Sequence, residues 1–203
     1  VAVTGSVTGD LTIGGTIGGG SGSVTIADLN DGGDVSLNGF PFNGTLTLTN
    51  GIDHAGASVT VGYLYYDGNI DLTNDDVAGR LRVGASYSHA QILNGGAVTS
   101  SGEVTLGFIP NYLSQGQATF ASVAAGGEIK TEGGLPLEAV IHVTGSMAGR
   151  IILVDDLGSS GAAGRIQIDG AMSGRIECAG DVFDGSAIQL GDSMSGTAGI
   201  AVD

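Results

Sequence analysis

The segment Met147–Ile151 (MAGRI) returns 25 residues later as Met172–Ile176 (MSGRI), and a looser copy, Met194–Thr197 (MSGT), follows after 22 more. Each copy stands just after a short stretch that alternates apolar residues with another residue, such as Ile166–Ile168 (IQI). A sequence period of about 20 to 50 residues is typical of repeat architectures, in which each repeat stacks on the next. This repeat therefore decides the fold class.

The same unit can be followed along the whole chain through its second strand, whose first inward residue recurs every 22 to 25 residues. These residues are Leu11, Val35, Val59, Leu81, Val104, Ile129, Ile151, Ile176 and Ile200. Two residues further on, the same face continues with Ile13, Leu37, Val61, Val83, Leu106, Thr131, Leu153, Cys178 and Val202. The residues between the two sets are mostly polar, as the alternation of a half-buried strand requires.

A first strand precedes each second strand, and a more variable side follows it. The first strand begins its inward face at Val1, Val24, Leu46, Ile70, Ile141, Ile166 and Ile188. Between about Gln91 and Ala125 the pattern blurs, and both Ile92 and Ala97 fit as its start. The variable side carries most of the aromatic residues, and glycine at the corners allows the tight turns that a coil needs.

Together these features predict an all-β fold: a single domain over residues 1–203 that forms a right-handed parallel β-solenoid, or β-helix. It would have about nine three-sided rungs of ~23 residues, stacked into a rod on the order of 40 Å long. An antiparallel β-sandwich also has short strands and frequent turns, but it gives no reason for residues 24 apart to match.

The composition agrees with thin rungs of aliphatic residues. The chain has 39 glycines, three prolines, no tryptophan and 41% hydrophobic residues among 203. Its net charge of −15 repels phosphate backbones and anionic membrane surfaces, so we expect no nucleic-acid partner. No segment approaches the ~18 apolar residues of a membrane span, so we expect no membrane insertion. The single cysteine, Cys178, is expected to pack in the core.

The glycine-rich cadence of Val7–Gly15 and Gly170–Ile176 resembles the solenoid repeats of large secreted bacterial surface proteins, such as autotransporter passengers and filamentous adhesins. The resemblance implies a noncatalytic structural or adhesive module that works outside the cell or at its surface. It covers nearly the whole chain in style, and no motif in it identifies one family.

The two ends of the repeat lack the polar cap that an isolated solenoid needs over its open core. Val1 and Val3 already lie on a first strand, and Ile200 and Val202 lie on a last second strand. Either flanking solenoid domains of a longer chain cover these residues, or copies of the chain stack end to end. We predict these four residues as a self-association surface that could build a filament or a surface layer.

The segment from Asp28 to Asp34 is the best candidate for a metal site. Asp28, Asn30, Asp31 and Asp34 place oxygen ligands around two glycines, and Ca²⁺ prefers six to eight oxygen ligands on a flexible turn. The alternative is a corner turn rich in Asp and Asn. Calcium is the only cofactor that the sequence suggests.

The outward residue just before the second strand forms a column of its own: Asp10, Asp34, Ser58, Arg80, Glu103, Glu128, Arg150, Arg175 and Thr197. Its register predicts ion pairs between Arg80 and Glu103 and between Glu128 and Arg150 on neighbouring rungs. Arg150 and Arg175 could instead hold a carboxylate or sulfate group of a glycan.

The alternative function is therefore a β-helix that binds or cleaves polysaccharide. Tyr65, Tyr87 and Tyr112 on the variable side would serve it as sugar platforms. An enzyme is not favoured, because His54, His89 and His142 fall at unrelated positions of the repeat and no catalytic triad follows from the register.

Overall fold

The structure is a computed structural model that describes residues 1–14, 22–38, 42–86, 89–108, 116–135, 138–158 and 163–202. In these residues the chain is all-β, without a helix, and forms two parallel sheets of nine strands each. The predicted fold class, a parallel β-solenoid, is confirmed. Two of the predicted residues, Tyr87 and Tyr112, lie outside the described residues.

Strands of the two sheets alternate along the chain. The odd-numbered sheet contains β1 (Ala2–Val7), β3 (Gly22–Leu29), β5 (Gly44–Leu48), β7 (Asn69–Asp71), β9 (Gln91–Val98), β11 (Gln117–Val123), β13 (Val140–Val143), β15 (Arg165–Ile168) and β17 (Ala187–Leu190). The even-numbered sheet contains β2 (Asp10–Gly14), β4 (Asp34–Asn38), β6 (Ser58–Val61), β8 (Arg80–Ser86), β10 (Glu103–Phe108), β12 (Glu128–Thr131), β14 (Arg150–Leu153), β16 (Arg175–Cys178) and β18 (Gly199–Val202).

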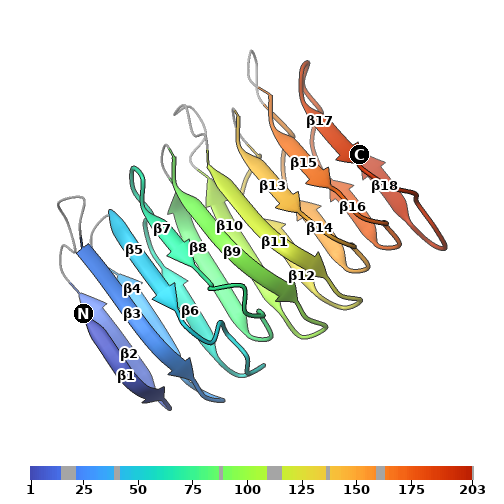
Figure 1. Ribbon diagram of the computed structural model, residues 1–203. Helices are drawn as coiled ribbons and strands as arrows, with labels where there is room; N and C mark the ends of the chain where they lie inside the picture. Colours follow the sequence, from blue (N-terminus) through green and yellow to red (C-terminus); the bar gives the residue numbers. More distant parts are fainter. Residues whose placement is uncertain are drawn as a thin grey trace.

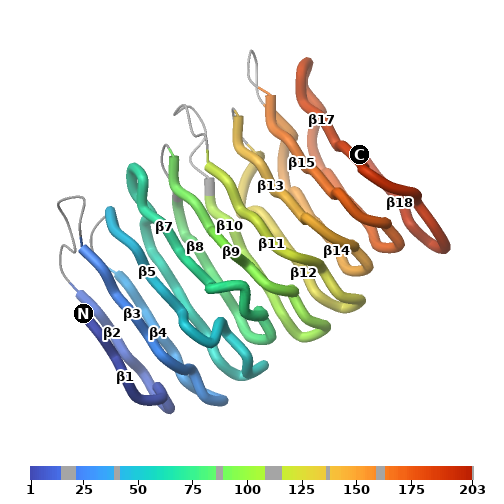
Figure 2. The backbone as a smooth tube through the Cα atoms, in the orientation of Figure 1, coloured from blue at the N-terminus to red at the C-terminus, as the bar shows by residue number. Residues whose placement is uncertain are grey.

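The two sheets face each other as two layers, and the chain coils between them in a right-handed sense (Figure 1). The chain ends lie at opposite ends of the rod (Figure 2). The coil makes about seven turns, slightly fewer than the nine rungs expected. The first and last strand pairs are each open on one side, so only the strand pairs between them have a neighbour on both sides.

The predicted register of the second strand is confirmed along the whole even-numbered sheet. Leu11 pairs with Val35 at one end, and Ile151, Ile176 and Ile200 are consecutive Cα partners at the other. From β4 to β16 these inward side chains are at most 4% exposed. Thr131, the polar exception, is completely buried, and its Oγ1 accepts a hydrogen bond from the backbone N–H of Val154 at 3.4 Å.

The odd-numbered sheet explains why the first strand blurs in the middle of the sequence. Ile92 pairs with both Ile70 and Ala118 and begins the inward face, whereas Ala97 lies later on the same strand and is only partly buried. Between them the register of β9 and β11 shifts, and Asn94 takes a positive φ of 51°. Such a bulge adds one residue and reverses the alternation beyond it, so both positions fitted the sequence pattern.

The repeated motif owes its form to the corner between an odd and an even strand. Met147 and Met172 are completely buried and bridge to each other across neighbouring rungs. A Cβ on Gly174 would lie 2.0 Å from the backbone oxygen of Gly149, so only glycine allows this approach of the rungs. The sulfur atoms of Met147 and Met172 are therefore part of the core, whereas Met194, in the last rung, is 44% exposed.

The variable third side is reduced to a few isolated bridges in the described residues. Phe42 bridges to Leu64, and Leu157 bridges to both Leu135 and Val182. These apolar residues close the core opposite the methionine corner, and all but Val182 are at most 3% exposed.

Candidate functional site

The open ends of the rod expose residues whose equivalents in the middle are buried. Val1 is 66% exposed at the β1 end, while Ile200 and Val202 are 41% and 50% exposed at the β18 end. Val3 is partly buried. These are the four residues predicted for self-association, and the structure places two of them at each end. Each end also presents two strand edges whose outer backbone groups have no strand partner among the described residues.

The predicted ion pairs between rungs are present on the outer face of the even-numbered sheet. Arg80 Nε lies 3.5 Å from Glu103 Oε2, and Arg150 Nη1 lies 3.4 Å from Glu128 Oε2. The last member of this column is Gly199, which pairs with Arg175, and not the predicted Thr197.

The two arginines predicted to bind a glycan carboxylate already share a carboxylate of the chain. Arg150 Nη2 donates a hydrogen bond to Glu177 Oε2 at 2.8 Å, and Arg175 Nε lies 3.7 Å from Glu177 Oε1. The hydrogen bond to Glu177 raises the pKa of the Arg150 guanidinium above its usual value. An external carboxylate would have to compete with Glu177 for both side chains.

A fifth arginine contact spans two rungs and was not predicted. Arg82 on β8 forms a bidentate ion pair with Glu132, with Nε–Oε1 and Nη2–Oε2 distances of 2.8 and 3.0 Å. Glu132 follows β12, so the arginine reaches over β10, where the chain has Gly107. The register of the second strand gives the positions of Arg82 and Thr131 on their strands. It does not show that the Arg82 side chain reaches over a whole rung, so the pair with Glu132 could not be predicted from the repeat.

The predicted calcium loop is a corner whose carboxylates bond to neighbouring rungs. The Ser6 hydroxyl donates a hydrogen bond to Asp28, and the Ser58 hydroxyl donates one to Asp34. The bond from Ser6 is the main cause of a pKa of Asp28 below its usual value. In the described part of the chain no three His, Cys, Asp or Glu side chains gather as a metal site. Calcium binding stays a prediction, tested by thermal melting with Ca²⁺ and with chelator.

Of the three predicted tyrosines, the structure describes only Tyr65. Tyr65 is half-buried, and its ring contacts that of Tyr66 edge to face, with centroids 4.1 Å apart at 80°. Tyr63 and Tyr66 are 47% and 44% exposed. These tyrosines lie between β6 and β7, on the variable side, where Tyr65 was predicted.

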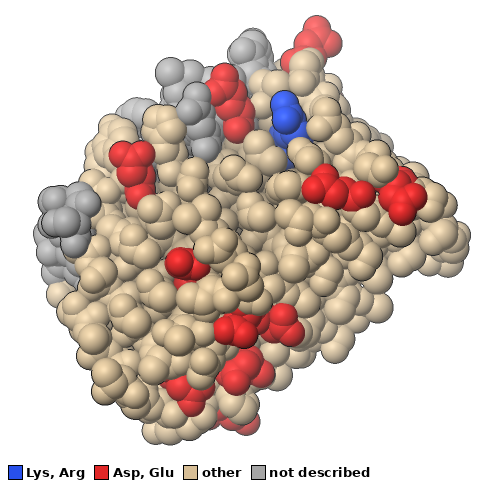
Figure 3. All heavy atoms as spheres, in the orientation of Figure 1, with Lys and Arg blue, Asp and Glu red and all other residues tan. Residues whose placement is uncertain are grey.

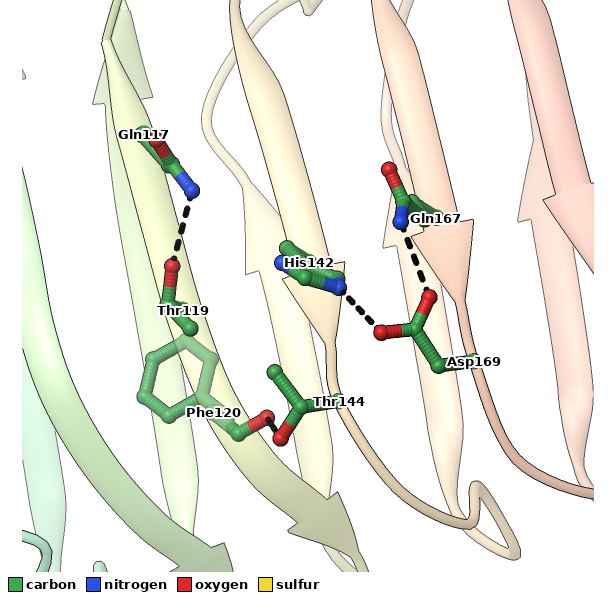
Figure 4. Close-up of polar contacts among 7 residues, drawn as sticks. All are labelled: Gln117, Thr119, Phe120, His142, Thr144, Gln167 and Asp169. Carbon is green, nitrogen blue, oxygen red and sulfur yellow. Dashed lines mark hydrogen bonds and ion pairs between the residues drawn. The ribbon is translucent and has the colours of Figure 1, made fainter. Parts of the chain in front are cut away.

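A histidine–aspartate pair on the outer face of the odd-numbered sheet was also missed. His142 Nε2 lies 2.8 Å from Asp169 Oδ2, and Gln167 Nε2 donates to Asp169 Oδ1 at 2.8 Å (Figure 4). These contacts lower the pKa of Asp169, the bond from Gln167 being the larger cause. Among the described residues no hydroxyl or thiol bonds to the His142 ring. The strand register, which aligns His142 with Gln167, could have indicated the pair.

Comparison with known proteins adds no identity to this geometry. No family model matches the chain, and neither a curated protein nor a solved structure matches it. In the described residues no helix is long and apolar enough to span a membrane.

Proposed function

We propose that the chain is a noncatalytic structural module whose rods stack end to end, the β1–β2 edge of one copy on the β17–β18 edge of the next. The observation that carries this proposal is the exposure of Ile200 and Val202 at register positions that are buried in every rung from β4 to β16. One further rung would bury them and pair the free strand edges.

The two edges are complementary because all strands in each sheet run parallel. A contact between different ends of identical rods does not close on itself, so it generates an open filament. Contact between two identical ends would set strands antiparallel and would not continue the register. The proposal therefore specifies a polar filament.

Charge supports the same orientation. Asp10 on β2 has Asp34 as its strand partner, and no lysine or arginine precedes Arg80 in the sequence. At a junction between two copies, Asp10 of one copy would be the strand partner of Gly199 of the other copy. Arg175 lies one strand beyond Gly199 in that copy. Arg82 reaches Glu132 over the same two-strand interval across a glycine. Arg175 could reach Asp10 of the next copy in the same way.

The resemblance to secreted bacterial surface proteins extends the proposal to an adhesive or surface-layer role outside the cell. The acidic, lysine-poor surface is compatible with that location. In a longer chain, flanking solenoid rungs would use the same two edges. Surface proteolysis of intact cells tests the location independently of assembly.

Electron microscopy and sedimentation of the purified 203-residue chain test the stacking. We expect rods that exceed the ~40 Å of one molecule and lengthen with concentration. Val202→Lys should abolish them by placing a charge in the junction. Val154→Lys is the matched control, since Val154 is 40% exposed but lies away from both ends. Strictly monomeric rods at 0.1 mM wild-type chain would instead favour flanking rungs.

A further inference from the structure

A ladder of uncharged polar side chains crosses five neighbouring strands on the outer face of the odd-numbered sheet. Its members stand just before the first inward residue of each strand from β3 to β11: Ser23, Thr45, Asn69, Gln91 and Gln117. Neighbouring strands are ~4.8 Å apart, so the ladder extends about 19 Å along the rod. Val140, Arg165 and Ala187 continue the column and end its polar part.

Most of the hydrogen-bonding capacity of this ladder is unused by the protein. Gln117 donates through Nε2 to Thr119 Oγ1 at 3.1 Å (Figure 4). Within the described ranges the side chains of the other four make no hydrogen bond to protein. On the opposite sheet, by contrast, outward polar groups such as Ser58 and Arg150 are bonded to carboxylates of neighbouring rungs. The ladder is therefore free to bond to a ligand.

A hollow of about 240 Å³ opens at the β3 end of the ladder. Ser23, Thr45, Asn69 and Asp67 line it, and a glycine pair lies between them. A Cβ on Gly44 would lie 2.1 Å from the backbone oxygen of Gly22, so this part of the wall has no room for a side chain. Amide, hydroxyl and carboxylate groups such as these can donate hydrogen bonds to sugar hydroxyls and accept hydrogen bonds from them.

We propose that this ladder binds a neutral polysaccharide chain, which lies along the rod with one sugar in the hollow. The face of the molecule on which the odd-numbered sheet lies is largely uncharged, with some acidic groups and little basic charge (Figure 3). The net charge of −15 repels acidic glycans, whereas a neutral chain incurs no such cost. The surface is separate from the stacking edges, so the inference goes beyond the proposed structural function. Rods stacked end to end in a filament would present one ladder per copy, and these repeated ladders would raise the avidity for a long polysaccharide.

Affinity electrophoresis in native gels tests the proposal on the full chain. The probes are galactomannan, mixed-linkage β-glucan, xyloglucan and dextran, with polygalacturonate as the acidic comparison. We expect at least one neutral polymer to retard the chain, and Asn69→Ala and Gln91→Ala each to weaken binding about three- to tenfold. Gln189→Ala is the matched control: it is an exposed, outward glutamine of the same sheet, on β17 and outside the ladder.

Three results would overturn the proposal: no retardation by any of the four neutral polymers, retardation by polygalacturonate alone, or equal affinities of the Asn69→Ala chain and the wild type. Asp67→Asn probes the hollow separately, because asparagine tolerates the positive φ of 52° at this position. Circular dichroism and the melting temperature of each variant show whether the solenoid remains folded. Rod length, measured by electron microscopy, is an independent readout of the stacking, so failure of one proposal leaves the other testable.

Discussion

Replacing Ile151 and Ile200 by alanine compares one register position in the middle and at the end of the same sheet. The two residues are separated only by Ile176, and they are 0% and 41% exposed. Each substitution removes three carbon atoms, worth about 2.4 kcal/mol at full burial. At Ile151 the enclosed cavity adds to this cost, so we expect a loss of about 3–4 kcal/mol. Ile200 is only about three-fifths buried, and its removal leaves no enclosed cavity. We therefore expect Ile200→Ala to lower the free energy of unfolding by about 1.5 kcal/mol.

Urea unfolding followed by circular dichroism, on dilute monomeric chain, measures both losses. In a chain of this size each kcal/mol corresponds to about 2–4 °C in melting temperature. At concentrations where rods assemble, the cost of Ile200→Ala should rise toward that of Ile151→Ala, because the next copy would cover Ile200. A loss below 1 kcal/mol at Ile151 would refute the register. A cost at Ile200 that does not change with concentration would refute the stacking.

The remaining predictions concern close approach, acid stability and an ion pair. A Cβ on Gly107 would lie 2.0 Å from Gly84 O, so Gly107→Ala should lower the urea midpoint strongly, while Gly14→Ala, with open space around it, should change it little. The pKa of Asp169 is lowered in the folded state. Its contribution to stability is therefore present above the unfolded value of about 3.9 and is lost as pH falls through the folded pKa. Asp169→Asn should flatten the decline of melting temperature below pH 4; an unchanged slope would contradict the bond geometry. A double-mutant cycle on Arg82 and its carboxylate partner should give about 0.5–1 kcal/mol, falling with salt.

The strand register could be predicted from the sequence because inward positions of a parallel solenoid repeat at nearly constant spacing. The pairing of Arg80 with Glu103 followed from it directly, since neighbouring rungs bring equivalent outward residues together. The bulge at Asn94 could not be predicted, because one inserted residue reverses the alternation and leaves two equally good alignments.

The missed contacts have different physical causes. Arg82 reaches two strands away, and Asp169 bonds to His142 from beyond the end of its strand. The Arg82 contact depends on the length of the arginine side chain and on the missing side chain at Gly107, which the repeat period does not encode, whereas the register of β13 and β15 brings His142 close to Asp169. The ladder from Ser23 to Gln117 differs, because its residue types were readable once the inward register of the first strand was known.

The distribution of charge gives the rod a polarity that the repeat by itself does not have. The rungs before Arg80 contain acidic residues and no lysine or arginine, so Asp10 and Asp34 stand side by side without a basic neighbour on β2 or β4. Screening by salt weakens that repulsion in a monomer, but a neighbouring copy that presents Arg175 would offset it directly. Assembly should therefore depend on the Arg175–Asp10 contact most at low ionic strength. Arg175→Asp should block rods there, and the added Asp10→Arg change should restore them, because the exchange reverses the pair and keeps its attraction. Rods that form equally well in the Arg175→Asp chain would show that apolar burial alone holds the junction.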